Sequence, residues 1–101
     1  MIPGLTSKLS ERNLAAAAII QQESDVIRVT DTTSTTTLTT ILPAGGGFSS
    51  LLFLQNKSGA SLTLVTTGNI QGTGSITVLN QRMAILVFSK LEGKWSVAND
   101  T

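Results

Sequence analysis

From Glu23 onward the chain is a succession of short segments in which apolar and polar residues alternate, separated by turns that contain glycine. In D-V-I-R-V-T, for example, Ile27 and Val29 alternate with Arg28 and Thr30. A period of two is the pattern of a β-strand with one buried face. Strands spaced by roughly eight to twelve residues, with glycine in the turns, are typical of antiparallel sandwiches and barrels. The sequence therefore predicts an all-β fold, an antiparallel β-sandwich or barrel of about seven or eight short strands.

The composition changes near Glu23, which predicts a division into an N-terminal arm at 1–22 and a β domain at 23–101. Ser10 is a suitable cap for a helix from Glu11 to about Gln22, and the four alanines at 15–18 favour helix. The apolar residues of this segment are not spaced for an amphipathic helix, so an extended arm that orders against a neighbour is the alternative.

Residues 82–90, R-M-A-I-L-V-F-S-K, are apolar at consecutive positions. A strand with this pattern is buried on both faces, so we expect a central strand or one that another chain covers. The stretch from Asp31 to Thr40 has a hydroxyl on eight of its ten residues. We expect a strand, or a turn at Asp31 to Ser34 followed by an edge strand, because threonine fits a half-solvated strand.

Composition argues against several classes of function. The net charge is +1 and the seven Lys and Arg residues are scattered, which argues against nucleic-acid binding. No apolar run approaches the roughly 18 residues of a membrane-spanning helix. We expect no signal peptide either, because no small-x-small cleavage site follows the apolar run at 14–20. A surface of low charge that is rich in Thr and Ser suits contact with other proteins.

No catalytic or metal-binding pattern stands out. The chain has neither cysteine nor histidine, and its carboxylates are not paired for acid–base chemistry. The glycines at 45–47 lack the lysine and the following helix of a phosphate-binding loop, so they predict a hairpin loop. We therefore predict no enzyme activity, no cofactor and no small-molecule substrate. Trp95, the one tryptophan, suits either the core or a partner or sugar contact.

Three segments follow a recurring order: T-L-T-T-I-L-P-A-G-G-G-F-S-S-L-L-F-L-Q-N-K-S-G-A-S-L-T-L-V-T-T-G-N-I at 37–70, S-I-T-V-L-N-Q-R-M-A-I-L-V-F at 75–88, and G-K-W-S-V-A at 93–98. The order is a Thr-rich strand, P-A-G-G, an apolar strand ending in Asn, and then a G-A-S-L-T-L strand. In this it resembles the small β modules of tailed-bacteriophage structural proteins, which occur as capsid decoration (cement) proteins and in phage fibres. The resemblance covers about residues 35–98.

The resemblance implies a virion protein that is made in the host cytoplasm, forms a homotrimer, and binds the major capsid protein on the outer capsid surface. The arm would then add strands to the capsid. The apolar residues of the arm and of the two-faced strand, with the tryptophan, are the expected partner-binding residues: Leu5, Leu9, Leu14, Ile19, Ile20, Met83, Ile85 and Trp95.

Two alternatives remain open. One is a fibre, spike or neck module, in which the loops at 43–47 and 66–74 contact a host glycan. The other is a carbohydrate-binding module that uses Trp95 and the Thr-rich face. On the predicted division, deletion of residues 1–22 should leave the β domain folded and weaken its attachment to the capsid.

Overall fold

The computed structural model describes residues 10–33, 35–44 and 51–98, and all regular structure in this part of the chain is β-strand. The prediction of an all-β fold is confirmed. The strands are β1 (Glu11–Ala15), β2 (Ile19–Gln21), β3 (Val26–Asp31), β4 (Thr37–Leu38), β5 (Thr40–Leu42), β6 (Leu51–Asn56), β7 (Leu62–Leu64), β8 (Ile70–Gln71), β9 (Ile76–Val78), β10 (Met83–Ser89) and β11 (Lys94–Val97).

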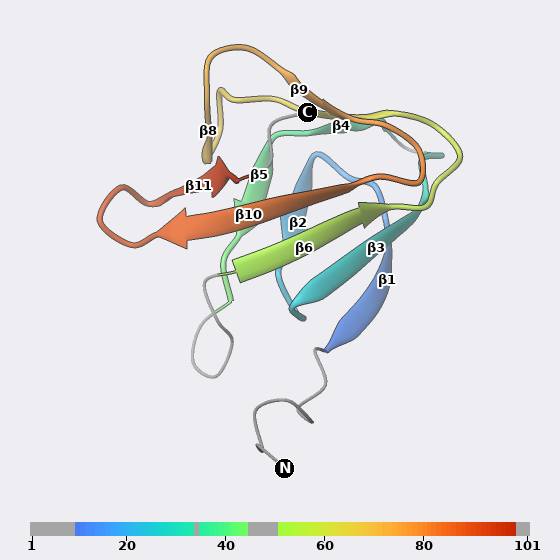
Figure 1. Cartoon of the computed structure of the whole chain (residues 1–101), viewed down its shortest axis with the longest axis horizontal. Helices are drawn as coiled ribbons and strands as arrows, with labels where there is room; N and C mark the ends of the chain where they lie inside the picture. The colour runs from blue at the N-terminus through green and yellow to red at the C-terminus, as the bar shows by residue number, and fades with distance from the viewer. Residues whose placement is uncertain (1–9, 34, 45–50, 99–101) are drawn as a thin grey trace.

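The strands form three sheets, and the chain passes between them repeatedly. A six-stranded sheet has the order β1-β3-β6-β10-β11-β8, a two-stranded sheet contains β2 and β5, and a three-stranded sheet has the order β4-β7-β9. The path from β3 through β4 and β5 therefore returns at β6, next to β3 and in the same direction. The chain coils in stacked turns, with the six-stranded sheet in front and the two-stranded sheet behind it in Figure 1.

Strand pairing is parallel between successive turns and mixed at the end of the coil, where β11 pairs with β8 in parallel. The pairs β1–β3, β3–β6, β2–β5 and β4–β7 are parallel. β10 runs antiparallel to both β6 and β11, and β9 antiparallel to β7. The predicted antiparallel pairing is thus correct only in part, because a strand reached through other sheets returns in its predecessor's direction. The predicted sandwich or barrel is not confirmed.

Stacked turns place equivalent apolar residues next to each other inside the coil. Ile20 pairs with Ile41, Ile27 with Leu54, and Leu38 with Leu64. All six are buried, and they belong to one hydrophobic core. Burying a side chain of this size contributes about 1.5–3 kcal/mol to folding. The core therefore runs along the coil and connects every turn.

Two side chains from later in the chain, Asn69 and Trp95, bind the backbone of β5 at Ile41. The Asn69 side chain accepts a hydrogen bond from the Ile41 amide at 2.9 Å and donates one to the Ile41 carbonyl at 2.6 Å. The Trp95 indole Nε1 donates to the same carbonyl at 3.0 Å, and its ring lies 5.2 Å from that of Phe88. A side-chain amide thus takes the place of a backbone strand partner, and the tryptophan fills the core beside it.

Asn56 ends β6 as a fully buried polar residue. Its side-chain nitrogen donates to the Ala60 carbonyl at 2.6 Å and to the Val78 carbonyl at 2.9 Å. Its side-chain oxygen accepts hydrogen bonds from the amide and the hydroxyl of Ser58. The residue therefore fixes the bend after β6 and attaches that bend to β9.

Residues 10–22 form the first turn of the coil, so the predicted helix from Glu11 to Gln22 is wrong. β1 pairs with β3, and the amide of Thr39 donates to the carbonyl of Ala18. Backbone pairing with the next turn overrides the helix propensity of the alanines. In the described part of this segment, β1 and β2 pair with β3 and β5 of the domain that was predicted to begin at residue 23.

The Thr-rich stretch forms the expected turn and a following edge strand. Oδ1 of Asp31 accepts from the Thr33 amide at 2.9 Å, which bends the chain after β3. β4 then lies at the edge of the three-stranded sheet. Threonine hydroxyls also bind backbone groups, as Thr39 Oγ1 does at the Ala18 carbonyl.

We predict that Asn56→Ala strongly destabilises the fold. The substitution leaves the carbonyls of Ala60 and Val78 without their donor, and each unsatisfied buried group costs about 1–3 kcal/mol. Urea unfolding followed by tryptophan fluorescence measures the loss. Asn13→Ala, at an exposed position of β1, is the control and should change the free energy of unfolding by less than about 0.5 kcal/mol. Equal effects at both positions would contradict the role of Asn56.

We also predict that deletion of residues 1–22 unfolds or severely destabilises the domain, contrary to the expectation from sequence. The deletion removes the strand partners of β3 and β5 and uncovers Ile27 and Ile41. Circular dichroism and thermal unfolding test this. A truncated chain with the melting temperature of the full chain would show that the first turn is dispensable.

Candidate partner-binding surface

The outer side of the six-stranded sheet is apolar over its three central strands. In β3, β6 and β10 the residues that point inward are core residues, among them Ile27, Leu54 and Leu86. The alternate residues of the same strands point outward, away from the core. Six of these outward side chains are apolar and are called the outer apolar face: Val26, Leu51, Phe53, Met83, Ile85 and Val87.

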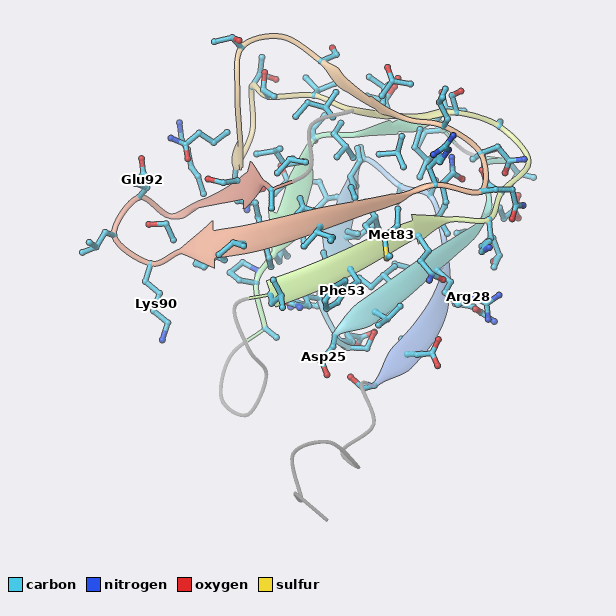
Figure 2. All side chains as sticks on the ribbon, in the orientation of Figure 1. Asp25, Arg28, Phe53, Met83, Lys90 and Glu92 are labelled. Atoms are coloured by element: carbon cyan, nitrogen blue, oxygen red, sulfur yellow. The ribbon has the colours of Figure 1, made fainter. Side chains whose placement is uncertain are left out.

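Strand register brings these side chains together in rows. Val26 pairs with Phe53, and Phe53 with Ile85, which makes one row across three strands. Leu51 pairs with Val87 in the next row. Paired positions on one face place their Cβ atoms about 4.5–5.5 Å apart, so the six side chains form one continuous patch. Figure 2 shows Phe53 and Met83 in front of this sheet.

Most of this face is more exposed than the core on the other side of the same strands, although Val26 is buried at 7%. Met83 is 36% exposed and Val87 is 43% exposed, whereas Ala84 and Leu86 between them are buried. Phe53 and Ile85 are half-buried. Single exposed apolar residues are common on proteins, but contiguous patches mark surfaces that bind other proteins or ligands.

The face is bordered by polar side chains on both sides. Asn13, Arg28 and Gln55 form one border, on β1, β3 and β6. Ser96 on β11 pairs with Val87 and forms part of the other. An apolar centre inside a polar rim is the usual anatomy of a protein–protein interface.

Only some of the predicted partner-binding residues lie on this face. Met83 and Ile85 do, as the two-faced pattern of 82–90 indicated, and β10 is a central strand between β6 and β11. Ile19 is 59% exposed but lies on β2, in the two-stranded sheet. Leu14 packs against the core from the first turn. Leu5 and Leu9 lie outside the described residues.

Two of the expected partner-binding residues are buried in the core. Ile20 is 6% exposed and packs against the second turn, and Trp95 is fully buried with its indole nitrogen bonded to Ile41. Neither side chain can contact a partner while the core is intact. Because Trp95 is buried, its ring cannot stack on a sugar. The carbohydrate-binding alternative requires that contact.

A second apolar feature lies at the first turn of the coil. A shallow hollow of about 300 Å³ is lined by Leu14, Ala15, Ala17, Ile19, Ile20, Gln21 and Glu23. At its rim Arg12 Nε lies 3.4 Å from Glu23 Oε2. β1 is one edge of the six-stranded sheet, whose opposite edge is β8, and β2 pairs only with β5.

Within residues 10–33, 35–44 and 51–98, no group of three or more His, Cys, Asp or Glu residues is close enough to hold a metal ion. The same residues contain no helix long and apolar enough to cross a membrane. The outer apolar face is thus the feature that best supports a functional argument.

Sequence reasoning missed several residues of this surface, namely Val26, Leu51, Phe53 and Val87, and the neighbouring Arg28. A signal for Leu51 and Phe53 was present, because L-L-F-L is apolar at every position. That signal indicates burial on both faces, but it does not say which face the chain itself covers.

Comparison with known proteins gives a fold likeness alone. No protein-family model matches the sequence, and no curated protein does. A solved structure of a chaperone–substrate complex contains a chain with a similar fold, with a TM-score of 0.65 and 10% sequence identity. The match covers 94% of this chain and 19% of the other, so this chain spans about a fifth of that longer one.

We predict that neighbouring positions of β10 respond very differently to truncation. Leu86→Ala removes a fully buried side chain and should cost about 2–5 kcal/mol of unfolding free energy. Val87→Ala, on the outer apolar face, should cost less than about 1 kcal/mol. Urea unfolding of both variants at low protein concentration measures the difference. A large loss at Val87 would show that the fold itself requires the outer apolar face.

Proposed function

We propose that the chain is a structural virion protein, a capsid decoration (cement) protein of a tailed bacteriophage. In this proposal it assembles as a homotrimer on the outer capsid surface and binds the major capsid protein. The observation that carries the proposal is the outer apolar face. It is a continuous apolar patch on strands whose other face already packs in the core. The resemblance of residues 35–98 to phage decoration and fibre modules supplies the biological setting.

The physical argument for a protein partner begins with solvation. Exposed apolar surface costs about 25 cal/mol per Å², which burial against another protein recovers. The net charge of +1 gives copies of the chain little mutual repulsion. A specific interface buries on the order of 1,600 Å² in total, so the patch and its polar rim would supply the centre of one interface.

Such a protein would act through binding energy alone. A subunit that binds the assembled lattice and not its dissociated parts shifts the equilibrium toward the intact shell. Many copies on one lattice multiply this effect, and no reacting group is needed. The proposal therefore includes no enzyme activity and no cofactor.

A fibre, spike or neck module is the second candidate, and two observations favour it. The similar fold occurs within a chain about five times as long, as it would in a multi-module protein. A polar hollow of about 240 Å³ also lies at the loop that was predicted to contact glycans, lined by Gln71, Gly72, Thr73, Ser75, Ile76 and Val97. Its amide and hydroxyl groups suit hydrogen bonds to sugar hydroxyls.

We predict that Val87→Lys disrupts assembly. A lysine on the outer apolar face would be buried in the interface without a partner charge, which is strongly unfavourable. Light scattering at micromolar concentration should give a trimer for the unmodified chain and a monomer for the variant. Sedimentation with tailed-phage capsids prepared without their decoration protein should show binding that the variant loses.

Leu91→Lys is the matched control. Leu91 is fully exposed in the turn between β10 and β11, so this variant adds the same charge away from the outer apolar face. It should assemble and bind capsids like the unmodified chain. A Val87→Lys variant that also does so would contradict the proposal, and a trimer without capsid binding would favour the fibre module.

A further inference from the structure

Exposed apolar side chains gather at two places in the described part of the chain. Met83 and Val87, two of the large apolar residues exposed there, belong to the outer apolar face. Ile19 and Leu42 are two more, and they lie together on the two-stranded sheet of β2 and β5. The others lie singly, in the turns before and after β10. The molecule therefore presents a second apolar surface besides the outer apolar face.

The second surface, called the rear apolar patch, consists of Ile19, Leu42 and the hollow at the first turn. The inward residues of β2 and β5 are Ile20 and Ile41, which pack in the core, so Ile19 and Leu42 point away from it. Ile19 pairs with Thr40, two residues before Leu42, which places the two apolar side chains diagonally on one face. Ile19 also lines the hollow of about 300 Å³, so the patch continues from β5 to the first turn.

The rear apolar patch and the outer apolar face lie on opposite sides of the core. The two-stranded sheet is behind the six-stranded sheet in Figure 1. Phe53 and Met83 of the outer apolar face are in front of the six-stranded sheet in Figure 2. Because the core lies between them, the two surfaces cannot meet within one molecule. Two copies can bring the front of one against the rear of the other.

Polar groups around the rear apolar patch already have partners within the chain. Gln21 Nε2 donates to the carbonyls of Leu42 and Pro43, at 3.1 and 3.3 Å. Arg12 and Glu23 at the rim of the hollow form an ion pair, so their charges offset each other. A cavity of about 150 Å³ accepts a benzene-sized group, so the hollow has room for an apolar side chain of another protein. The patch therefore suits an apolar protein surface.

Symmetry determines what such a surface meets in a trimer. In a two-fold dimer a surface contacts its own counterpart, whereas in a three-fold ring each copy contacts the next through two different surfaces. A homotrimer that uses the outer apolar face therefore needs a second, complementary surface on the same chain. The rear apolar patch meets this need, because it is apolar and lies on the other side of the core. A net charge of +1 gives the copies little mutual repulsion.

We infer that the rear apolar patch binds the outer apolar face of a second copy of this chain. Each interface of the trimer then joins Val87 and its neighbours on one copy to Ile19 and Leu42 on the next. The inference rests on the proposed function in one respect, namely that the chain forms a homotrimer. It adds the surface that the partner copy contributes to each interface.

The test combines two variants that each lack one of the surfaces. Ile19→Lys places an unpaired charge in the rear apolar patch, as Val87→Lys does in the outer apolar face, and light scattering should show a monomer for each. An equimolar mixture should give a one-to-one complex with twice the mass of either variant. The intact outer apolar face of Ile19→Lys binds the intact rear apolar patch of Val87→Lys. The complex cannot grow further, because its remaining surfaces carry lysine.

Leu79→Lys is the matched control for the added charge. Leu79 is exposed in the turn between β9 and β10, outside both surfaces, so this variant should form the trimer on its own. Circular dichroism and thermal unfolding check that each variant is folded. If Ile19→Lys fails to fold, Leu42→Lys takes its place in the mixture, since Leu42 is also exposed on the rear apolar patch.

Two results would overturn the inference and leave the proposed function standing. One is a trimer for Ile19→Lys, and loss of capsid binding by that trimer would assign the rear apolar patch to the capsid protein. The other is a mixture of two folded, monomeric variants that stays monomeric. A dimer of the unmodified chain that persists in Ile19→Lys would show that the outer apolar face binds itself, which removes the inference and the homotrimer. A trimer for Val87→Lys would contradict the inference and the proposed function together.

Discussion

The parallel pairing of successive turns is the constraint on which the rest of this structure depends. It fixes which residue of one turn lies next to which residue of the following turn, as in the pairs of Ile20 with Ile41 and of Ile27 with Leu54. The same register that aligns these inward side chains also aligns the outward ones. The core and the outer apolar face are therefore two consequences of one set of backbone hydrogen bonds, since alternate residues point to opposite faces.

Where a backbone group lacks a strand partner, a side chain supplies the hydrogen bond instead. Asn69 binds the backbone of Ile41 through both its donor and its acceptor, and Trp95 shares the same carbonyl. At the bend after β6, the Asn56 side chain likewise donates hydrogen bonds to backbone carbonyls. These residues explain how a coil of so few turns holds together. Each supplies directional bonds at a position where the sheets themselves are short.

The sequence predicted the fold class well and the topology poorly. Alternation in segments such as 25–30 identifies strands, but the same pattern suits parallel and antiparallel pairing, so the glycine-containing turns suggested hairpins. The alanines at 15–18 favour helix in isolation, and only pairing with β3 and β5 decides otherwise. Met83 and Ile85 were predictable from a strand that is apolar on both faces. Phe53 was not, because an apolar run such as L-L-F-L does not say which face the chain itself covers.

The open first turn makes the stability of this fold uneven along its length. β1 and β2 each pair on one side, whereas β3, β6 and β10 each have a partner on both sides. Detaching β1 breaks one ladder, whereas detaching β6 breaks two, so opening free energies should rise from β1 toward β6. Amide hydrogens of β1 would then exchange with solvent faster than those of β6. Such a gradient leaves a rigid surface at β6 and β10 beside an end that opens and closes readily.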